Sequence, residues 1–469
     1  MLFNSIQFLL FFFVVCIVYY ILQGNKARNL FLLVASYYFY MNWEPIYAVL
    51  ILLSTIITYV CGLLVEKSND KHRTIYLVVS LLLNLGILFI FKYYDFINSS
   101  VTFLLSQWGL KWDVPNLHLL LPVGISFYTF QAIGYSIDVY RGTIPAERNF
   151  FTYALFVSFF PQLVAGPIER AKNLLPQFHT EHSLKYNNVS EGVKQMIWGF
   201  FMKLCIADII SEYVDAVYNN IVNHGGLSII LATLFFTIQI YCDFSGYSNI
   251  AIGAARVMGF KLMDNFRQPY LSHSLKEFWK RWHISLSTWF MDYVYIPLGG
   301  NRVKYSRHLL NLFITFLVSG IWHGANWTFL IWGAIHGIFI SIENVWNRFI
   351  KLPPPQQQSI KPINTITSFI IVAFAWLFFR ANNLYDAIIA IQKMFTAPGE
   401  LYVDNSIFLF GFMGISVLAF KDIKDRYNMD IKLLHSQNPV IKYGSFVLLF
   451  SYILLFGAFY GGQFIYFQF

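Results

Sequence analysis

The sequence predicts an all-α, polytopic membrane protein with roughly ten to twelve membrane-spanning or re-entrant helices. Three observations predict this class. Of the 469 residues, 57% are hydrophobic and 12% are charged, whereas about 25% of the residues in a soluble domain are charged. Apolar runs of about the 20 residues that a span needs recur along the whole chain. Proline and glycine interrupt several of these runs, and a broken helix at membrane depth must be buried in protein or line a wet cavity.

The clearest spans lie near the two ends of the chain. The first, Ile6–Leu22, has no basic region and no small-residue cleavage site, so we expect it to remain as a helix. Asn29–Met41 is short for a span and is expected to be tilted or to form a hairpin with the next helix. Further runs of nearly spanning length are Ile46–Val65, Ile75–Phe91 and Tyr443–Tyr460.

The middle of the chain is less regular. Leu119–Tyr140 and Phe150–Val164 are interrupted by proline and glycine, which favours a centre with re-entrant pieces over a simple bundle. Arg256–Arg281 mixes bulky apolar and basic residues, so we expect interfacial helices on the cytoplasmic face. Pro353–Gln358 is expected to be a solvated linker. The sequence shows no internal repeat, which disfavours an inverted-repeat transporter.

The net charge of +9 does not indicate a nucleic-acid-binding protein, because the basic residues form short clusters between apolar runs. Cytoplasmic loops of membrane proteins favour lysine and arginine. The loop between Lys92 and Asp113 is nearly neutral and is expected to face outward, which places the N-terminus outside. The clusters assigned to the cytoplasm are Lys26/Arg28, Lys67/Lys71/Arg73, Arg141/Arg148, Arg170/Lys172 and Arg302/Lys304/Arg307.

The sequence predicts neither a metal site nor a disulfide framework. The four cysteines are scattered, form no CxxC pair and are interpreted as small core residues. HExxH, GxSxG, Walker and GxGxxG motifs are absent from the sequence.

The most informative segment is Leu309–Ile340, which has no Asp, Glu, Lys or Arg and yet contains His323. A histidine in so apolar a segment needs a partner or a chemical role. It is either a core histidine bonded to a neighbouring helix or a general base, since imidazole titrates near neutral pH. Gly324 and its small neighbours leave room beside the ring, Trp322 can form a wall, and Asn326 can hold a polar group.

Two further histidines frame this candidate. His336 would face another way on a continuous helix, so it is interpreted as structural, unless the helix breaks near Gly324. His283 follows Lys280 and Arg281 at a predicted entry into the membrane. It is either an interfacial anchor or a second site histidine, and the two cations can meet the phosphates of a donor such as a coenzyme A thioester.

Asp243 is the third candidate, as the only Asp, Glu, Lys or Arg between Asp215 and Arg256. A buried carboxylate is costly unless it is paired or hydrated. It is therefore either a site residue or a hydrogen-bonding centre joined to Tyr241, Ser245 or an arginine such as Arg256 or Arg267. The predicted substrate-binding residues are Asn326, Trp322, Tyr241, Asp243, Gln239, Lys280 and Arg281.

Several long motifs resemble the membrane-bound O-acyltransferase (MBOAT) superfamily, and within it the bacterial alginate O-acetyltransferase branch. The resemblance covers nearly the whole chain in the expected order. The motifs are Phe278–Trp289, Asp292–Arg302, Trp322–Trp327 and Trp332–Gly337, supported by Pro161–Ile168, Tyr241–Ser248, Trp376–Ala381 and Gln463–Phe467.

The resemblance implies one integral membrane domain around a central tunnel, with peripheral helices in residues 1–115, a catalytic core in 116–345 and further helices in 364–469. The family's invariant histidine falls on His323, and its second polar position falls on His283. Both are predicted to be catalytic, with His323 acting as general base or as a transient acyl carrier.

The function that the resemblance implies is transfer of an acyl group, acetyl above all, from cytoplasmic acetyl-CoA across a bacterial inner membrane. The thioester is a donor substrate, and no bound cofactor is expected. The expected partners are membrane lipids, an extracytoplasmic acetyltransferase and a polysaccharide acceptor such as alginate, peptidoglycan or cellulose, without nucleic acid. The alternatives are D-alanyl transfer from a carrier protein to teichoic acid, acylation of a lipid, and a non-catalytic polysaccharide transporter.

Overall fold

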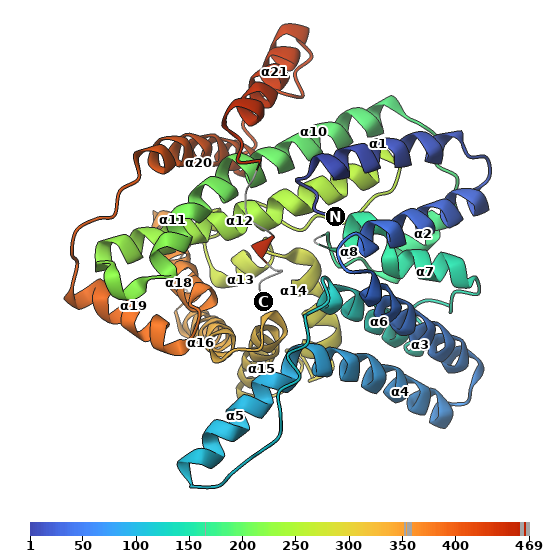
Figure 1. The fold of residues 1–469 in the computed structure, drawn as a ribbon, viewed down its shortest axis with the longest axis horizontal. Helices are drawn as coiled ribbons and strands as arrows, with labels where there is room; N and C mark the ends of the chain where they lie inside the picture. Colours follow the sequence, from blue (N-terminus) through green and yellow to red (C-terminus); the bar gives the residue numbers. More distant parts are fainter. Residues whose placement is uncertain (165, 351–352, 354–358, 460–463, 466–469) are drawn as a thin grey trace. The chain divides into compact units, whose positions relative to one another are not determined.

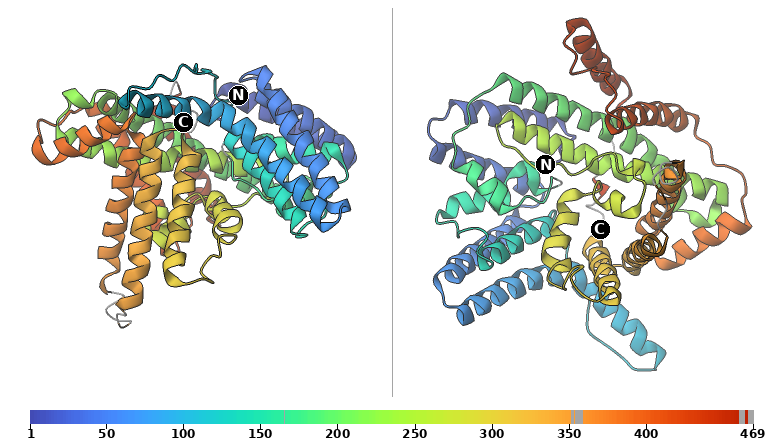
Figure 2. Two further views of the ribbon diagram at one scale, coloured as in Figure 1. Left: turned by 90° about the horizontal axis from the view of Figure 1, so that it is seen from below. Right: turned by 180° about the vertical axis from the view of Figure 1, so that it is seen from behind.

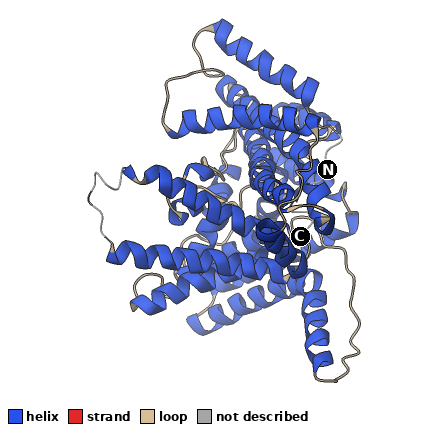
Figure 3. Ribbon diagram, turned by 90° about the vertical axis from the view of Figure 1, so that its left-hand side faces the viewer, coloured by secondary structure: helices blue, strands red, loops and turns tan. Residues whose placement is uncertain are grey.

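The computed structural model describes residues 1–164, 166–350, 353, 359–459 and 464–465, and all regular structure in these ranges is helical (Figures 1 and 3). This confirms the predicted all-α class. The predicted linker Pro353–Gln358, apart from Pro353, lies outside the described residues, as do Gln463, Tyr466 and Phe467 of the last motif.

The helices follow one another along the chain. The α-helices are α1 (Ile6–Ile21), α2 (Asn25–Met41), α3 (Ala48–Lys67), α4 (Asp70–Leu88), α5 (Tyr94–Gln107), α6 (Ile125–Tyr140), α7 (Phe150–Ser158), α8 (Phe160–Leu163), α9 (Ala171–Phe178), α10 (Tyr186–Met202), α11 (Asp208–Tyr218), α12 (Gly226–Val257), α13 (Leu275–Trp279), α14 (Ile284–Phe290), α15 (Tyr305–His323), α16 (Trp327–Phe349), α18 (Lys361–Arg380), α19 (Leu384–Thr396), α20 (Asn405–Arg426) and α21 (Pro439–Phe456). Short 3₁₀ segments are η1 (Pro45–Tyr47), η4 (Ile221–Asn223) and η5 (Pro269–Leu271), and π-helical segments are η2 (Phe89–Tyr93), η3 (Lys203–Ala207) and η6 (Met291–Tyr295). Longer connections lie between α5 and α6, between α12 and α13 and between α20 and α21.

Seven helices of the described chain are long and apolar enough to cross a membrane. A helix can cross a membrane because it satisfies its backbone hydrogen bonds internally. The predicted polytopic membrane protein is therefore confirmed. Helix α1 is apolar but shorter than these seven. The seven helical segments are Pro45–Lys67, Asp70–Gln107, Gly226–Val257, Trp327–Phe349, Lys361–Arg380, Asn405–Arg426 and Pro439–Phe456.

The predicted interruptions in the middle of the chain are present. The first, in Leu119–Tyr140, delays the start of α6 until after Gly124, which has a φ of 74° that favours glycine. The second breaks α7 from α8 at Phe159, just before Pro161. Interfacial helices were expected in Arg256–Arg281, and the structure has two short helical segments, η5 and α13, between residues 258 and 281.

Contacts divide the described chain into two compact units, Met1–Val193 with Ala251–Met263, and Lys194–Ile250 with Asp264–Phe469. In the first unit, α3 packs against α4 and α6, and α2 packs against α7. Polar side chains on these apolar helices bond to one another. Ser80 and Ser136 are 2.9 Å apart, and the Tyr153 hydroxyl donates to Thr58 at 2.7 Å. Such bonds hold helices together where an apolar medium offers no other partner.

The second unit contains a tight hairpin of α15 and α16, which lie side by side (Figure 2). The hairpin turns at Gly324, whose extended backbone ends α15, and at Asn326, whose side chain caps α16 by accepting from the Thr328 N–H at 3.1 Å. A Cβ on Gly333 would lie 2.5 Å from the Phe316 carbonyl oxygen. Glycine therefore allows the two helices to approach closely, and this approach fixes the position of His323 at the end of α15.

Candidate active site

His323 is the last residue of α15, and its side chain is buried. Its ring centroid lies 4.8 Å from that of Trp322, 4.9 Å from that of Trp332 on α16 and 5.4 Å from that of Phe379 on α18. Three helices of the second unit therefore position the imidazole. These rings also place apolar surface against the imidazole.

The glycine beside His323 has a different role from the one predicted. The sequence indicated that Gly324 leaves room for a ligand. A Cβ at Gly324 would instead collide with the ring of Phe329, and one at Gly320 would collide with the Phe329 carbonyl oxygen. The space is filled by α16, because these glycines serve helix packing.

His283 precedes α14 and is fully buried. Its Nδ1 lies 3.1 Å from the side-chain oxygen of Asn265, which also accepts from the Ser285 hydroxyl at 2.9 Å. An amide oxygen only accepts hydrogen bonds, so Nδ1 carries the proton and Nε2 carries the lone pair. Burial lowers the pKa of His283 to about 3, and the ring is neutral at physiological pH.

The backbone at His283 is unusual for a side chain with a Cβ. Its φ of 42° and ψ of 54° lie in the left-handed region. Such a conformation costs of order 1–3 kcal/mol and persists where the surroundings enforce it. The Ile284 N–H donates to the Asn265 carbonyl oxygen at 2.9 Å, and the Asn265 amide donates to Ser248 on α12 at 3.1 Å. Asn265 therefore ties both the backbone and the ring of His283 to α12.

Trp322 joins the two predicted catalytic histidines. Its ring centroid lies 6.3 Å from that of His283 and 4.8 Å from that of His323. Phe244 on α12 also contacts His283, with the two ring centroids 4.5 Å apart in an edge-on arrangement. The structure thus brings His283, Trp322 and His323 into one aromatic cluster, although 40 residues of sequence separate the histidines.

His336 belongs to the same cluster. The Trp279 indole N–H donates to its Nδ1 at 3.4 Å, and its ring centroid lies 5.0 Å from that of Trp332. Trp332 also contacts His323. The separation expected for His323 and His336 depended on a continuous helix, and it does not apply because the chain turns after His323 and folds α16 back on α15.

Asp243 has a partner that the sequence did not indicate. Its Oδ1 lies 2.6 Å from the Lys203 ammonium, which also lies 2.7 Å from Asp208, and its Oδ2 accepts from the Ile465 N–H at 2.7 Å. The expectation of Tyr241, Ser245 or an arginine as its partner is wrong. Burial alone would lower the pKa of Lys203, but Asp243 and Asp208 outweigh it and hold this pKa above its ordinary value.

The remaining candidates are more widely distributed. Tyr241 donates to Asp422 on α20, with its hydroxyl 3.1 Å from the nearer carboxylate oxygen. The side-chain oxygen of Gln239, also on α12, is buried and has no hydrogen-bond partner among the described residues. The side chain of Asn326, besides capping α16, donates to the Asn382 carbonyl oxygen at 3.0 Å.

The two predicted phosphate-binding cations differ in their surroundings. Lys280 is exposed. Arg281 is half-buried, lies 3.0 Å from Glu277 and donates to the Arg267 carbonyl oxygen at 3.0 Å. Lys280 is therefore the more accessible cation beside His283.

The model of the MBOAT, membrane-bound O-acyltransferase, family matches residues 144–387. The chain belongs to this family. The matched region contains His283 and His323, the hairpin of α15 and α16, and the Lys203 ion-pair site.

Relatives with assigned names cover most of this MBOAT protein. A probable alginate O-acetylase of Pseudomonas aeruginosa is 39% identical over 92% of this chain and 83% of its own length. A peptidoglycan O-acetyltransferase of Helicobacter pylori is 35% identical over 84% of this chain and 80% of its own. A teichoic acid D-alanyltransferase of Streptococcus thermophilus is 30% identical over 57% of this chain and 70% of its own. The MBOAT protein is an O-acyltransferase and a multi-pass membrane protein.

Proposed function

We propose that this MBOAT protein transfers acetyl from cytoplasmic acetyl-CoA to a hydroxyl group of an extracytoplasmic polysaccharide, across a bacterial inner membrane. The observation that carries the proposal is the buried cluster in which Trp322 joins His283 and His323. Relatives named as acetyl-transferring enzymes align over more of the chain, and at higher identity, than the D-alanyltransferase relative does. This favours acetyl over D-alanyl as the transferred group.

His323 is proposed as the general base. The acceptor hydroxyl gives its proton to the His323 imidazole while its oxygen attacks the thioester carbonyl carbon. The carbon–sulfur bond then breaks, and the departing coenzyme A thiolate takes the proton from the imidazolium. A general base of this kind contributes about 10²–10⁴ in rate. Acylation of His323 itself, with the acetyl group moving from sulfur to nitrogen and then to the hydroxyl oxygen, is the alternative route through the same residue.

The neutral His283 is proposed to act beside it through Nε2, since Asn265 holds the Nδ1 proton. Trp322 is proposed as the wall of the acyl site, with Gln239 and Tyr241 as polar contacts further along α12. The exposed Lys280 is proposed to meet donor phosphates as a point charge.

Three predicted substrate-binding residues fit supporting roles better. Asp243 is engaged by a lysine and a backbone N–H, Asn326 caps a helix, and Arg281 is paired with Glu277. We assign these three side chains to holding the active-site elements in place. The acceptor remains a polysaccharide, presented by an extracytoplasmic acetyltransferase partner.

The test compares two buried histidines of the same cluster. Membranes containing wild-type protein, His323→Ala or His336→Gln receive acetyl-CoA and acetyl acceptors, namely alginate, peptidoglycan fragments and cellulose oligomers. Free coenzyme A and acetylated polymer are measured. We expect His323→Ala to lose about 10²–10⁴ of the acceptor-dependent rate, and His336→Gln to retain activity, since His336 lies outside the proposed chemistry.

Two results would contradict the proposal. Wild-type activity in a folded His323→Ala variant would show that His323 is neither the general base nor the acyl carrier. Absence of acceptor-dependent coenzyme A release from wild-type protein, with D-alanyl transfer from a carrier protein or polysaccharide export in its place, would favour the alternatives. Thermal melting of each variant shows whether lost activity reflects lost folding.

A further inference from the structure

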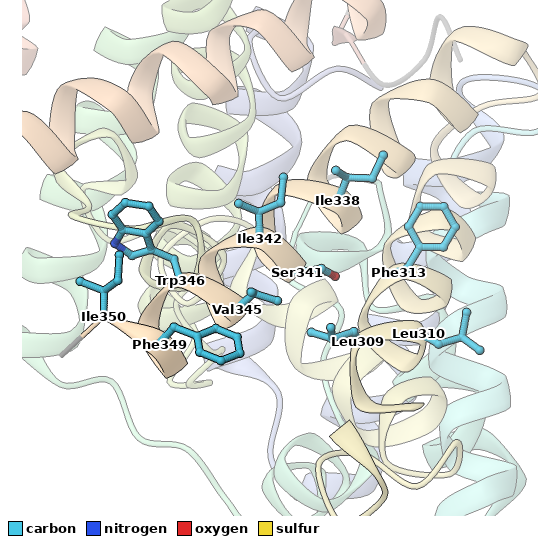
Figure 4. A pocket seen from close by; sticks show the side chains of 10 residues that line it. All are labelled: Leu309, Leu310, Phe313, Ile338, Ser341, Ile342, Val345, Trp346, Phe349 and Ile350. Atoms are coloured by element: carbon cyan, nitrogen blue, oxygen red, sulfur yellow. The ribbon is translucent and has the colours of Figure 1, made fainter. Parts of the chain in front are cut away.

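An apolar groove runs along the outer face of the α15–α16 hairpin, with a volume of about 580 Å³ (Figure 4). Side chains between Leu309 and Phe313 on α15 and between Ile338 and Ile350 on α16 line it. Besides the indole of Trp346, Ser341 has the only polar side-chain group of the lining, and its hydroxyl donates to the Gly337 carbonyl oxygen at 2.7 Å within α16. The groove therefore offers mainly alkyl and aromatic carbon, and the hydroxyl proton of Ser341 is already used within α16.

Basic residues occur at the ends of α15 and α16 that adjoin one end of this groove. The guanidinium of Arg348, in the last turn of α16, lies 4.1 Å from the centre of the Tyr305 ring at the start of α15. Lys304 and Arg307 are exposed at the same end of α15. Trp346, which lines the groove, is 59% exposed. Tryptophan, tyrosine and cationic residues gather where a membrane meets water, so this end lies at headgroup depth.

We propose that the groove binds one acyl chain of an anionic glycerophospholipid, with the lipid phosphate held by Arg348 and Arg307. The apolar lining matches the chain, and the cations at the rim match the phosphate and the net negative charge of the headgroup. Basic pockets between membrane helices on the cytoplasmic side are suited to anionic headgroups, and the sequence assigns the cluster containing Arg307 to that side.

The size of the groove separates a lipid chain from a protein partner. Small-molecule sites have volumes of about 300–1,000 Å³, which includes this groove. Three turns of an α-helix, about 10–12 Å across and 16 Å long, occupy roughly 1,500 Å³. A partner helix or a second copy of this chain would therefore cover the groove without entering it.

The location of the groove gives the lipid a structural consequence. Leu309 and Phe349 lie at the end of the hairpin opposite His323, which is the last residue of α15. A chain wedged between the two helices fixes their separation at one end, while Gly320 and Gly333 fix it at the other. Bound lipid therefore stabilises the element that carries the predicted catalytic imidazole.

The experiment uses the full chain in detergent after removal of lipid. Thermal melting and native mass spectrometry are recorded with dioleoyl phosphatidylglycerol, which is anionic, and with dioleoyl phosphatidylcholine, which has the same acyl chains and a headgroup without net charge. We expect one phosphatidylglycerol to bind per chain and to raise the melting temperature, at lower concentration than phosphatidylcholine does. Arg348→Ala should weaken this binding about fivefold, because it removes the contribution of one cation to the affinity for the anionic headgroup.

The control is Arg256→Ala, because Arg256 is also exposed and also lies in the last turn of a long helix, α12. It should bind the lipid as wild type does. Ser341→Phe fills the groove and should abolish binding of both lipids. Ile338→Trp is the second groove-filling variant, since Ile338 is 47% exposed and tolerates a larger side chain if Ser341→Phe does not fold.

Each other outcome overturns the proposal. Equal affinity for the two lipids would show that the cations do not bind the headgroup. Unchanged binding in a folded groove-filling variant would show that the acyl chain does not bind in the groove. Competition by free glycerol phosphate as effective as that of the lipid shows an anion site that needs no acyl chain. A dimer mass in place of a lipid adduct shows that a second copy covers this face.

Discussion

Lys203 supplies the positive charge between Asp208 and Asp243, and its removal tests how the second unit is held together. The three side chains are 2–3% exposed, with distances of 2.7 Å to Asp208 and 2.6 Å to Asp243. Lys203→Met keeps the length and apolar stem but leaves two buried carboxylates without a counter-ion. Breaking a buried ion pair in this way costs about 3–5 kcal/mol. At about 2 °C per kcal/mol for a unit of this size, the melting temperature should fall by about 6–10 °C.

The chain contains its own reporter for this measurement. Cys205 and Cys242 are free and fully buried in the second unit, so a thiol-reactive dye reports its unfolding in detergent once Cys16 and Cys61 of the first unit are replaced by serine. The control is Lys432→Met, because Lys432 and Asp430 form an exposed pair at 3.2 Å and such pairs contribute about 0–1 kcal/mol. A Lys203→Met variant that melts with the wild type would refute the reasoning.

A second form of the experiment separates lost charge from lost packing. Burial raises the pKa of Asp208 to about 7 even with Lys203 beside it. Lys203 lowers this pKa, so without the lysine it should rise further. Asp208 should then take up a proton at or above neutral pH, and melting should recover as the pH is lowered from 8. Combining Lys203→Met with Asp208→Asn and Asp243→Asn removes all three charges and should restore part of the loss at pH 8. No recovery in either case would attribute the loss to packing.

Two further predictions concern His283 and the α15–α16 hairpin. The native pKa of His283 is about 3, and the unfolded value is near 6.5. The unfolded state therefore binds the extra proton between these values, and the free energy of unfolding decreases as the pH is lowered, by up to about 1.4 kcal/mol per pH unit. The stability advantage of wild type over His283→Asn should shrink by about 2 kcal/mol from pH 7.5 to 5, and a constant difference in thermal melts would contradict it. Gly333→Ala should lower the melting temperature, because its Cβ would lie 2.5 Å from the Phe316 carbonyl oxygen. Gly444→Ala is the control, and it should raise the melting temperature slightly because Gly444 has open space around it. Equal shifts in the two variants would show that the hairpin adapts to the added methyl group.

Much of the fold could be predicted because membrane helices follow from apolar length. The predicted runs Ile46–Val65, Ile75–Phe91 and Tyr443–Tyr460 overlap candidate spans, whereas Ile6–Leu22 corresponds to a shorter apolar helix. The breaks near Gly124 and Pro161 follow from backbone chemistry. The candidate histidines could also be located, because an imidazole in an apolar run is costly. Their joining through Trp322 depends on tertiary contacts that no spacing reveals.

The residues that sequence reasoning missed are those whose partners depend on irregular structure. Lys203 and Asp208 are five residues apart, a spacing that an ordinary helix places on different faces. The π-helical turn Lys203–Ala207 brings them together, and the Asp208 N–H bonds to the Lys203 carbonyl oxygen. A lone lysine in the apolar stretch before Asp208 was the available signal. Asn265 had none, since its bond to His283 arises in a loop between α12 and α13.

The bond between Asp243 and the backbone of Ile465 sets an order of events during biosynthesis. The two residues are 222 positions apart in the chain. At about 5–20 residues per second, a ribosome needs roughly 11–44 s to travel that distance. During this interval α12 has already been made, but the Ile465 N–H that donates to Asp243 Oδ2 has not yet been synthesised. Membrane insertion of the early helices therefore precedes closure of this site, and a stalled nascent chain retains an incomplete core.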